Sequence, residues 1–174
     1  MDKIILAGYM GSGKTTIGKI LSSRLGLPFL DLDEEIERTQ GLSVGEIFKQ
    51  KGEIHFRKLE RATLTEILQR PQSFVLAMGG GTPCYSGNDR LLREDGVQSF
   101  YLKSSVAELS RRLTGEKSSR PMIANLSDND LPGFIGTHLF ERDPFYRRAK
   151  YIVDTAGMTP GEVASVISAQ LSRA

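Results

Sequence analysis

The stretch that decides the fold is Gly8-Tyr9-Met10-Gly11-Ser12-Gly13-Lys14-Thr15, which directly follows the apolar run Ile4-Ile5-Leu6-Ala7. It matches the pattern G-x-x-x-x-G-K-[ST], and its setting predicts a buried strand before it and a helix over Lys14–Leu25 after it. The glycines let the backbone curl until successive N–H groups point at a phosphate. The helix then begins with its positive dipole end facing the same anion. A glycine-rich turn without a ligand would not require Lys14, nor a strand before it and a helix after it. We therefore predict a phosphate-binding loop.

The size and composition of the chain indicate one ordinary globular domain. Its 174 residues can bury a core without staples, and its apolar fraction of 39% and charged fraction of 25% are typical of such proteins. The net charge of +2 is too small to indicate a nucleic-acid partner. The single Cys84 excludes an intramolecular disulfide, and no apolar run is long enough to span a bilayer. With a strand predicted almost from the first residue, we expect no targeting segment and a soluble cytoplasmic enzyme.

Five predicted strands alternate with helices along the chain, which indicates a parallel sheet covered by helices on both faces. Ser43 and Thr159 are expected to cap the helices that follow them, and Pro144 to kink or divide a long helix. The strands are expected at 3–7, 29–33, 73–78, 97–102 and 151–154, and the helices at 14–25, 34–40, 44–50, 53–69, 90–94, 106–113, 131–150 and after 159.

Three polar groups follow the first three predicted strands. The phosphate loop follows the first, Asp31 and Asp33 end the second, and Gly79-Gly80-Gly81 follows the third. Ligands of such sheets bind beyond the carboxyl ends of the strands, so these groups should converge on one crevice.

Asp31 and Asp33 have two interpretations. One acid could hold water around Mg²⁺ while the other takes a hydroxyl proton, or both could cap the next helix; we expect each interpretation to hold in part. The third strand lacks a terminal acid of the kind that assists Mg²⁺ in many phosphate-loop enzymes, and the acids of the second strand offer a substitute.

Three further segments carry chemistry that is ambiguous when each is taken alone. The triple glycine indicates either close backbone approach or a tight turn. Arg57, Glu60 and Arg61 lie on adjacent helical turns, as on any salt-bridged surface helix. The polar, irregular stretch over 114–129 contains Arg120-Pro121 and is either a mobile lid that brings an arginine to a γ-phosphate or a disordered surface loop.

Together these pieces resemble the shikimate kinase family over nearly the whole chain. The phenylalanine–arginine–glutamate segment combined with the triple glycine is the most selective part. The motifs that carry the resemblance are Gly-x-x-Gly-x-Gly-Lys-Thr-Thr at 8–16, Asp31-Leu32-Asp33, Gly52-Glu53-x-x-Phe56-Arg57-x-x-Glu60, Gly79-Gly80-Gly81, Arg120-Pro121 and Arg142-x-x-x-Tyr146-x-x-x-Lys150.

This resemblance implies an α/β fold of the nucleoside-monophosphate-kinase type, in three α/β/α layers around a five-stranded parallel sheet. It implies one kinase domain over 1–174, with an acceptor-binding segment at about 33–61 and a mobile lid at about 114–126. The implied reaction transfers the γ-phosphoryl group of ATP to the 3-hydroxyl of shikimate, with Mg²⁺, in aromatic amino acid biosynthesis. We expect a monomer whose partners are these two small molecules, with no nucleic acid and no membrane.

The resemblance also implies a role for each matching residue. Arg57 and Arg142 would grip the shikimate carboxylate, since the planar guanidinium fork suits a carboxylate, and Glu60 would orient Arg57. Arg112, with Arg111 as a competitor, would stack on adenine opposite Pro160. The implied catalytic residues are Lys14, Asp33 and Arg120; the nucleotide contacts are Gly11, Ser12, Gly13, Lys14, Thr15, Thr16, Arg112, Arg120 and Pro160; the acceptor contacts are Asp33, Phe48, Phe56, Arg57, Glu60, Gly79, Gly80, Gly81 and Arg142; and the metal-site residues are Thr15 and Asp31.

Two rival functions share part of this pattern. A gluconate or nucleotide kinase of the same fold could use the same arginine pair, although Phe48, Phe56 and the triple glycine favour a flat cyclic acid. A nucleotide-dependent switch is the rival from another class. It would not need an acceptor pocket, and a guanine-reading Asn-Lys-x-Asp motif is absent from the sequence.

Overall fold

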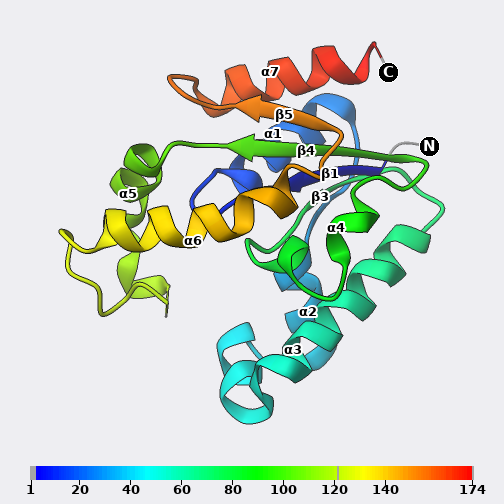
Figure 1. Cartoon of the computed structure of the whole chain (residues 1–174). Coiled ribbons are helices and arrows are strands. Elements are labelled where there is room, and N and C mark those ends of the chain that lie inside the picture. The colour runs from blue at the N-terminus through cyan, green and yellow to red at the C-terminus, as the bar shows by residue number, and fades with distance from the viewer. Residues whose placement is uncertain (1–2, 121, 174) are drawn as a thin grey trace.

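A five-stranded parallel sheet, in the order β2-β3-β1-β4-β5, forms the centre of the computed structural model, which describes residues 3–120 and 122–173 (Figure 1). Every neighbouring pair of strands is parallel, and β1 in the middle pairs with both β3 and β4. The predicted three-layer α/β class is therefore confirmed. The strands are β1 (Lys3–Ala7), β2 (Phe29–Asp31), β3 (Phe74–Ala77), β4 (Val97–Lys103) and β5 (Tyr151–Asp154).

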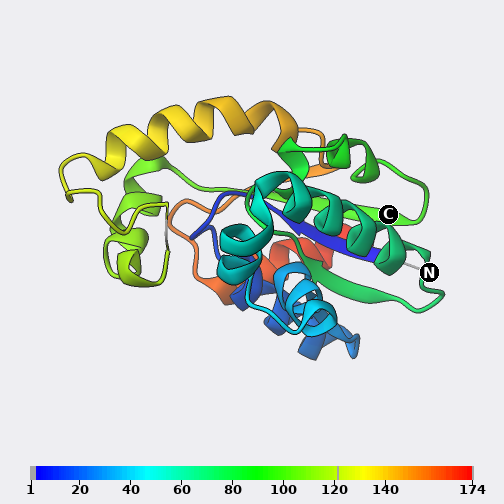
Figure 2. The same ribbon diagram turned by 90° about the horizontal axis from the view of Figure 1, so that it is seen from below.

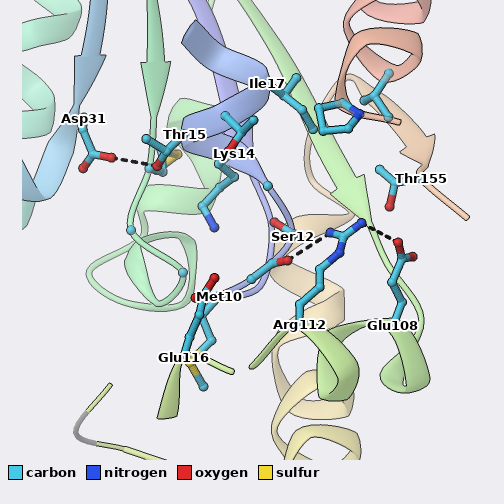
Figure 3. A pocket seen from close by; sticks show the side chains of 18 of the residues that line it. Met10, Ser12, Lys14, Thr15, Ile17, Asp31, Glu108, Arg112, Glu116 and Thr155 are labelled. Carbon is cyan, nitrogen blue, oxygen red and sulfur yellow. Dashed lines mark hydrogen bonds and ion pairs between the residues drawn. The ribbon is translucent and has the colours of Figure 1, made fainter. Parts of the chain in front are cut away.

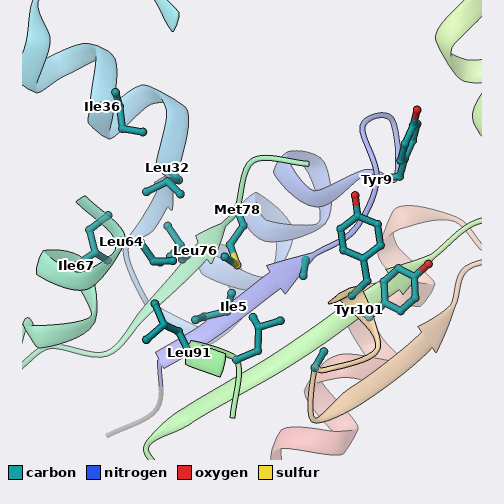
Figure 4. Close-up of a cluster of buried hydrophobic side chains, with 14 of the residues drawn as sticks. Ile5, Tyr9, Leu32, Ile36, Leu64, Ile67, Leu76, Met78, Leu91 and Tyr101 are labelled. Atoms are coloured by element: carbon teal, nitrogen blue, oxygen red, sulfur yellow. The ribbon is translucent and has the colours of Figure 1, made fainter. Parts of the chain in front are cut away.

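Alternating side chains of the strands divide the core between the two faces of the sheet. Ile4 and Leu6 of β1 face α1 (Lys14–Leu25) and α7 (Pro160–Leu171), which cover one side. Ile5 and Ala7 face the other side, which is covered by the remaining helices; Figure 2 shows α3 in front of the strands, and Figure 4 shows the cluster beneath it. The remaining elements are α2 (Leu32–Gln40), α3 (Val44–Gln69), α4 (Asn88–Leu91), α5 (Val106–Thr114), α6 (Leu131–Tyr146) and two 3₁₀ turns at Thr82–Cys84 and Lys117–Ser119.

Side-chain caps fix several helix starts where the sequence predicted them. Ser43 and Glu46 form a capping box at the start of α3, and Thr159 and Glu162 form another at the start of α7. At Gly52 the backbone of α3 has φ 80° and ψ 171°, so this element consists of two helices joined at a break, as the separate predictions over 44–50 and 53–69 require.

Some element boundaries differ from the prediction. β2 ends at Asp31 rather than at 33, because the Asp31 side chain accepts the N–H of Asp33 and starts α2. The short helix α4 begins at Asn88 rather than at 90. Helix α6 continues through Pro144 and ends at Tyr146, so the proline does not divide it, although it lies within the last turn.

The polar stretch after α5 is a succession of turns that is packed against the rest of the protein. Ile123 is fully buried in the core cluster, and its N–H donates to the carbonyl of Arg120. This packing gives the stretch more structure than its composition suggested. No helix in the described part of the chain is long and apolar enough to cross a membrane.

Candidate active site

A cavity of about 630 Å³ lies beyond the carboxyl ends of β1, β2 and β3 (Figure 3). The phosphate loop, the two acids after β2 and two of the three glycines line it, so the structure brings together the groups that follow the three strands. The predicted residues that line this cavity are Gly11, Ser12, Gly13, Lys14, Thr15, Thr16, Asp31, Asp33, Gly79, Gly80, Arg112, Arg120 and Pro160. Those that do not line it are Phe48, Phe56, Arg57, Glu60, Gly81 and Arg142.

The phosphate loop leads into the amino end of α1. Gly13 precedes the helix with a φ of 93°, a left-handed conformation that favours glycine. Lys14 Nζ donates to the carbonyls of Gly8 and Tyr9, each at 2.9 Å, and burial lowers the pKa of this ammonium to about 8. The buried hydroxyl of Ser12 has no hydrogen-bond partner among the described residues. The loop therefore holds a lysine and a hydroxyl ready to donate to an anion.

Thr15 and Asp31 form a polar pair beside the loop. Thr15 Oγ1 donates to Asp31 Oδ2 at 3.1 Å (Figure 3). Within residues 3–120 and 122–173, no group of three or more His, Cys, Asp or Glu side chains could hold a metal ion. A hydroxyl and one carboxylate fit Mg²⁺ all the same, since this ion takes one or two carboxylates in nucleotide sites and completes its shell with phosphate oxygens and water.

Asp33 lines the cavity near two other carboxylates. Burial, with smaller contributions from the charges of Asp31 and Glu60, raises the pKa of Asp33 to about 6, and the charge of Lys14 limits this rise. Such a carboxylate is ionised at neutral pH and close to the point at which it can accept a proton, which is the property of a general base.

Each of the three glycines lies close to a different neighbour, which a side chain at that position would meet. A β-carbon on Gly80 would lie 3.1 Å from the backbone nitrogen of Met10 in the phosphate loop. On Gly81 it would lie 3.1 Å from Nη2 of Arg57. On Gly79 it would lie 2.8 Å from the hydroxyl of Thr82 and 3.2 and 3.3 Å from the carboxylates of Asp33 and Glu60. Close approach is therefore the reason for the triple glycine, and it joins the loop to the segment that carries Arg57.

Glu60 holds Arg57 from below the surface. Glu60 is 1% exposed, and its carboxylate receives Nη1 of Arg57 at 2.9 Å together with the hydroxyl of Thr82. The rings of Phe48 and Phe56 lie 4.5 Å apart beside the same guanidinium. The helical spacing that alone indicated a surface salt bridge thus belongs to a half-buried arginine oriented by a buried glutamate.

Arg142 is a buried cation without an acidic partner. It is 8% exposed, and no Asp or Glu of the described residues forms an ion pair with it; the ring of Tyr9 lies 5.9 Å from its guanidinium carbon. Burial raises the pKa of the Cys84 thiol to about 11, and the charges of Arg142 and Arg57 act against this rise. Both arginines therefore lie near Cys84; Glu60 pairs with Arg57, whereas Arg142 has no acidic partner among the described residues, so an entering anion would compensate the charge of Arg142.

The opposite end of the cavity is built by α5 and the start of α7. Arg112 Nη1 donates to the carbonyl of Gly11 at 3.0 Å, and Nη2 pairs with Glu108 (Figure 3). Arg112 is thus held against the phosphate loop. Arg111, the predicted competitor, lines the cavity as well. Residues of this end that the sequence did not indicate are Glu108, Thr155, Met158 and Val163.

Arg120 reaches the cavity from the stretch after α5. Its Nε donates to Glu116 Oε2 at 2.9 Å, and its side chain is 34% exposed. The neighbouring Pro121, predicted to fix the local geometry, lies outside the described residues.

Comparison with known proteins gives the family of the chain. The family model described as shikimate kinase matches residues 10–172. A shikimate kinase from Flavobacterium psychrophilum is 46% identical over 167 residues, which are 96% of this chain and 97% of the relative. The chain belongs to the shikimate kinase family. The resemblance carried by the sequence motifs is therefore confirmed.

Solved shikimate kinases have the same fold as this family member. The crystal structure of shikimate kinase from Bacteroides thetaiotaomicron superposes with a TM-score of 0.90 at 35% identity, covering 98% of both chains. Shikimate kinase from Acinetobacter baumannii in complex with shikimate gives a TM-score of 0.87 at 34% identity, covering 99% of this chain and 94% of the other.

Several aromatic contacts around this shikimate kinase fold were not predicted from the sequence. The hydroxyl of Tyr9 lies 2.9 Å from Nδ1 of His138, and the hydroxyl of Tyr146 donates to the carbonyl of Gly80. Tyr85 stacks over a guanidinium. Each joins residues from different elements, and no spacing along the chain signals such a contact.

Proposed function

We propose that the chain is a shikimate kinase in activity, transferring the γ-phosphoryl group of ATP to the 3-hydroxyl of shikimate to give shikimate 3-phosphate and ADP. The observation that carries the proposal is the buried guanidinium of Arg142, which lies near Arg57 and has no acidic partner among the described residues. A buried cation without an anionic partner is costly, and an acceptor carboxylate would supply the missing negative charge.

The phosphate loop and the opposite end of the cavity would bind the nucleotide. Backbone N–H groups of the loop, the hydroxyl of Ser12 and the ammonium of Lys14 would surround the phosphates. Lys14 would exchange its two carbonyl acceptors for phosphate oxygens. Arg112 and Pro160, at the far end, would enclose adenine, with Arg111 as the alternative.

The segment around α3 and the triple glycine would bind the acceptor. Arg57 and Arg142 would hold its carboxylate through paired N–H donors, and Glu60 would keep Arg57 in place. Phe48 and Phe56 would provide an apolar wall. The remaining predicted contacts, Asp33 and the backbone of Gly79, Gly80 and Gly81, would meet the ring hydroxyls.

Asp33 is the proposed base. As the acceptor oxygen bonds to the γ-phosphorus and the bond to the bridging oxygen of ADP breaks, Asp33 would take the hydroxyl proton. Its pKa near 6 suits this transfer at neutral pH. Lys14 and Arg120 would stabilise the charge on the equatorial oxygens, which is the main task of a protein in phosphoryl transfer.

Thr15 and Asp31 are the residues that would hold Mg²⁺ beside the nucleotide. When bound, the ion neutralises charge on the β- and γ-phosphate oxygens. Asp31 would in this way supply the acid that is missing after β3.

The test is release of ADP from ATP and Mg²⁺ with shikimate, gluconate or nucleoside monophosphates offered separately. Of the three acceptors, we expect only shikimate to support turnover. The product should give a new phosphate-ester resonance in a phosphorus NMR spectrum. Turnover with gluconate or a nucleotide and none with shikimate would reject the proposal in favour of a rival kinase. Nucleotide hydrolysis unaffected by all acceptors would favour a switch.

A further inference from the structure

Tyr85 makes the closest cation–aromatic contact in the described chain. Its ring centroid lies 3.9 Å from the guanidinium carbon of Arg57, whereas those of Phe56 and Phe48 lie at 5.3 and 5.9 Å. At 3.9 Å the guanidinium is in stacking contact with the ring, while at the longer distances the rings only flank it.

A constrained turn places Tyr85 there. The residue follows the 3₁₀ turn Thr82–Cys84, and the two residues after it, Ser86 and Gly87, have φ values of 55° and 68°. Ser86 is the one non-glycine residue of the described chain in this left-handed region, which disfavours a side chain. The N–H of Asn88 then donates to the carbonyl of Tyr85 at 3.0 Å and closes the turn. The unfavourable backbone conformation of Ser86 thus lies in the turn that holds the ring of Tyr85 over Arg57.

The ring of Tyr85 is more exposed than the guanidinium that it contacts. Both residues border a second hollow of about 430 Å³, which is lined by Glu53, Ile54, Arg57, Lys58, Tyr85 and Ser86. Tyr85 is 37% exposed, yet the side chain of Arg57 is only 15% exposed. The hydroxyl of Tyr85 has no hydrogen-bond partner among the described residues, so the contact with Arg57 depends on the ring.

The acidic neighbours of Arg57 restrain its guanidinium plane only in part. Glu60 binds one nitrogen, Nη1. Glu53 accepts from Nε and Nη2 with a single oxygen at 3.4 and 3.3 Å, and its side chain is 54% exposed, so this pair is weak. A flat ring against the guanidinium face adds a restraint on its plane that the weak, exposed pair with Glu53 does not supply.

We propose that Tyr85 is a positioning residue for acceptor recognition: its ring fixes the plane of Arg57 and shields it from water, so that the fork meets the acceptor carboxylate ready for two parallel bonds. This inference rests on the proposed function, in which Arg57 binds that carboxylate. A preorganised, shielded arginine binds a carboxylate more tightly than a mobile, hydrated one, because less freedom is lost and less salt reaches the pair.

The experiment compares Tyr85→Phe, Tyr85→Leu and Tyr85→Ala with the unmodified enzyme in steady-state assays with ATP and shikimate. Removing the ring should raise KM for shikimate roughly 5- to 20-fold while kcat and KM for ATP change less than about twofold. Tyr85→Phe keeps the ring and should retain a KM within about twofold of the original. In Tyr85→Leu and Tyr85→Ala, KM for shikimate should also rise more steeply between roughly 20 and 300 mM salt.

Ile54→Ala is the matched control, because Ile54 lines the same hollow and is 77% exposed. It should leave KM for shikimate and its salt dependence unchanged. The inference is wrong if Tyr85→Ala and Tyr85→Leu keep the original KM, if Tyr85→Phe loses as much as Tyr85→Ala, or if Ile54→Ala has the same effect. Absence of shikimate turnover in the unmodified enzyme would overturn the proposed function and the role of Tyr85 together, whereas the Tyr85 and Ile54 variants test the role of Tyr85 alone once turnover is observed.

Discussion

At the residue scale, the chemistry depends on how burial shifts two charges in opposite directions. Burial lowers the pKa of Lys14 and raises that of Asp33, so each group is brought closer to neutral pH than it would be in water. The two also interact: Lys14 lowers the pKa of Asp33, and Asp33 raises that of Lys14. The cation that would hold the phosphates and the proposed base are therefore linked before any substrate binds.

The pKa of Asp33 predicts the acidic limb of the pH profile. With a pKa of about 6, the ionised fraction falls below one half under that pH, and kcat/KM for shikimate should decrease about tenfold for each further pH unit. The measurement is kcat/KM between roughly pH 5 and 8. Asp33→Asn should lose most activity and no longer show this limb; a variant that keeps the same pH profile would mean that another group titrates.

The ionised carboxylate of Asp33 should lower the free energy of unfolding at neutral pH. Its folded pKa is raised above the ordinary value of 3.8, so the folded state binds the proton more tightly, and the free energy of unfolding contributed by Asp33 increases as the pH falls through 6. Asp33→Asn should therefore raise the free energy of unfolding at pH 7.5, by up to about 3 kcal/mol, and give little gain near pH 4. Denaturant titrations at both pH values measure this, and an equal gain at both would contradict the assignment.

Substitutions of Lys14 and Arg57 should affect different steps, the first phosphoryl transfer from ATP and the second shikimate binding. Lys14→Ala should lower kcat by roughly 100-fold or more, because a donor to the developing charge is lost. Arg57→Ala should chiefly weaken shikimate binding and nearly preserve ATP affinity. Calorimetric titration of each ligand into Arg57→Ala checks the second half, and equal losses for both ligands would refute the division.

At the scale of elements, the triple glycine connects the strand layer to both halves of the site. Gly80 packs against the loop after β1, and Gly81 packs against Arg57 of α3. Tyr146, at the end of α6, donates to the carbonyl of Gly80 from the other side. One three-residue segment therefore sets the spacing between the donor loop and two acceptor elements.

Alanine substitutions along this segment should separate the two ligands. In Gly80→Ala the new methyl would meet the backbone of the phosphate loop, which cannot move aside, so ATP affinity and stability should both fall. In Gly81→Ala it would meet the end of the Arg57 side chain, so KM for shikimate should rise severalfold with ATP binding retained. Gly136→Ala is the control: it meets nothing within 4 Å in α6, and should add about 1 kcal/mol of stability without changing kinetics. Identical kinetic effects of Gly80→Ala and Gly81→Ala would argue against separate neighbours.

The local signals in the sequence predicted the elements and the donor half well. The phosphate loop, the strand–helix alternation and the caps at Ser43 and Thr159 each depend on neighbours within a few residues, which is why they can be read from the chain. The exact end of β2 was missed because capping by Asp31 competes with strand continuation. Tyr85 over Arg57 was missed because their contact spans two elements, and only folding determines which aromatic ring meets which cation.

At the scale of the whole molecule, the proposed nucleotide and acceptor contacts come from different sets of helices. α5 and α7 form the nucleotide end, Asp33 of α2 lines the cavity near the phosphate loop, and the acceptor contacts of α3 lie outside its lining. The stretch after α5 carries Arg120 to the cavity and is anchored by the buried Ile123. A closure of this stretch would pivot on that anchor rather than move as a free loop.

Nucleotide binding should therefore slow hydrogen exchange selectively in the stretch after α5. With a non-hydrolysable ATP analogue and Mg²⁺, the amides of residues 115–120 and 122–130 should exchange more slowly, while those of the sheet, already protected, should hardly change. Exchange measured by mass spectrometry tests this. Equal protection with and without nucleotide would argue against a lid, and Arg120→Ala should retain the protection while losing turnover.

Gly80 packs directly against the backbone of the phosphate loop, since a β-carbon on it would lie 3.1 Å from the nitrogen of Met10. The segment that carries the proposed acceptor contacts is therefore next to the loop that would hold the phosphates. A compound that joins a nucleotide phosphate chain to a cyclic acid would thus need only a short tether to occupy both sites at once. In such a compound the affinities of the two halves would combine through a high effective concentration, and lengthening the tether would diminish that advantage.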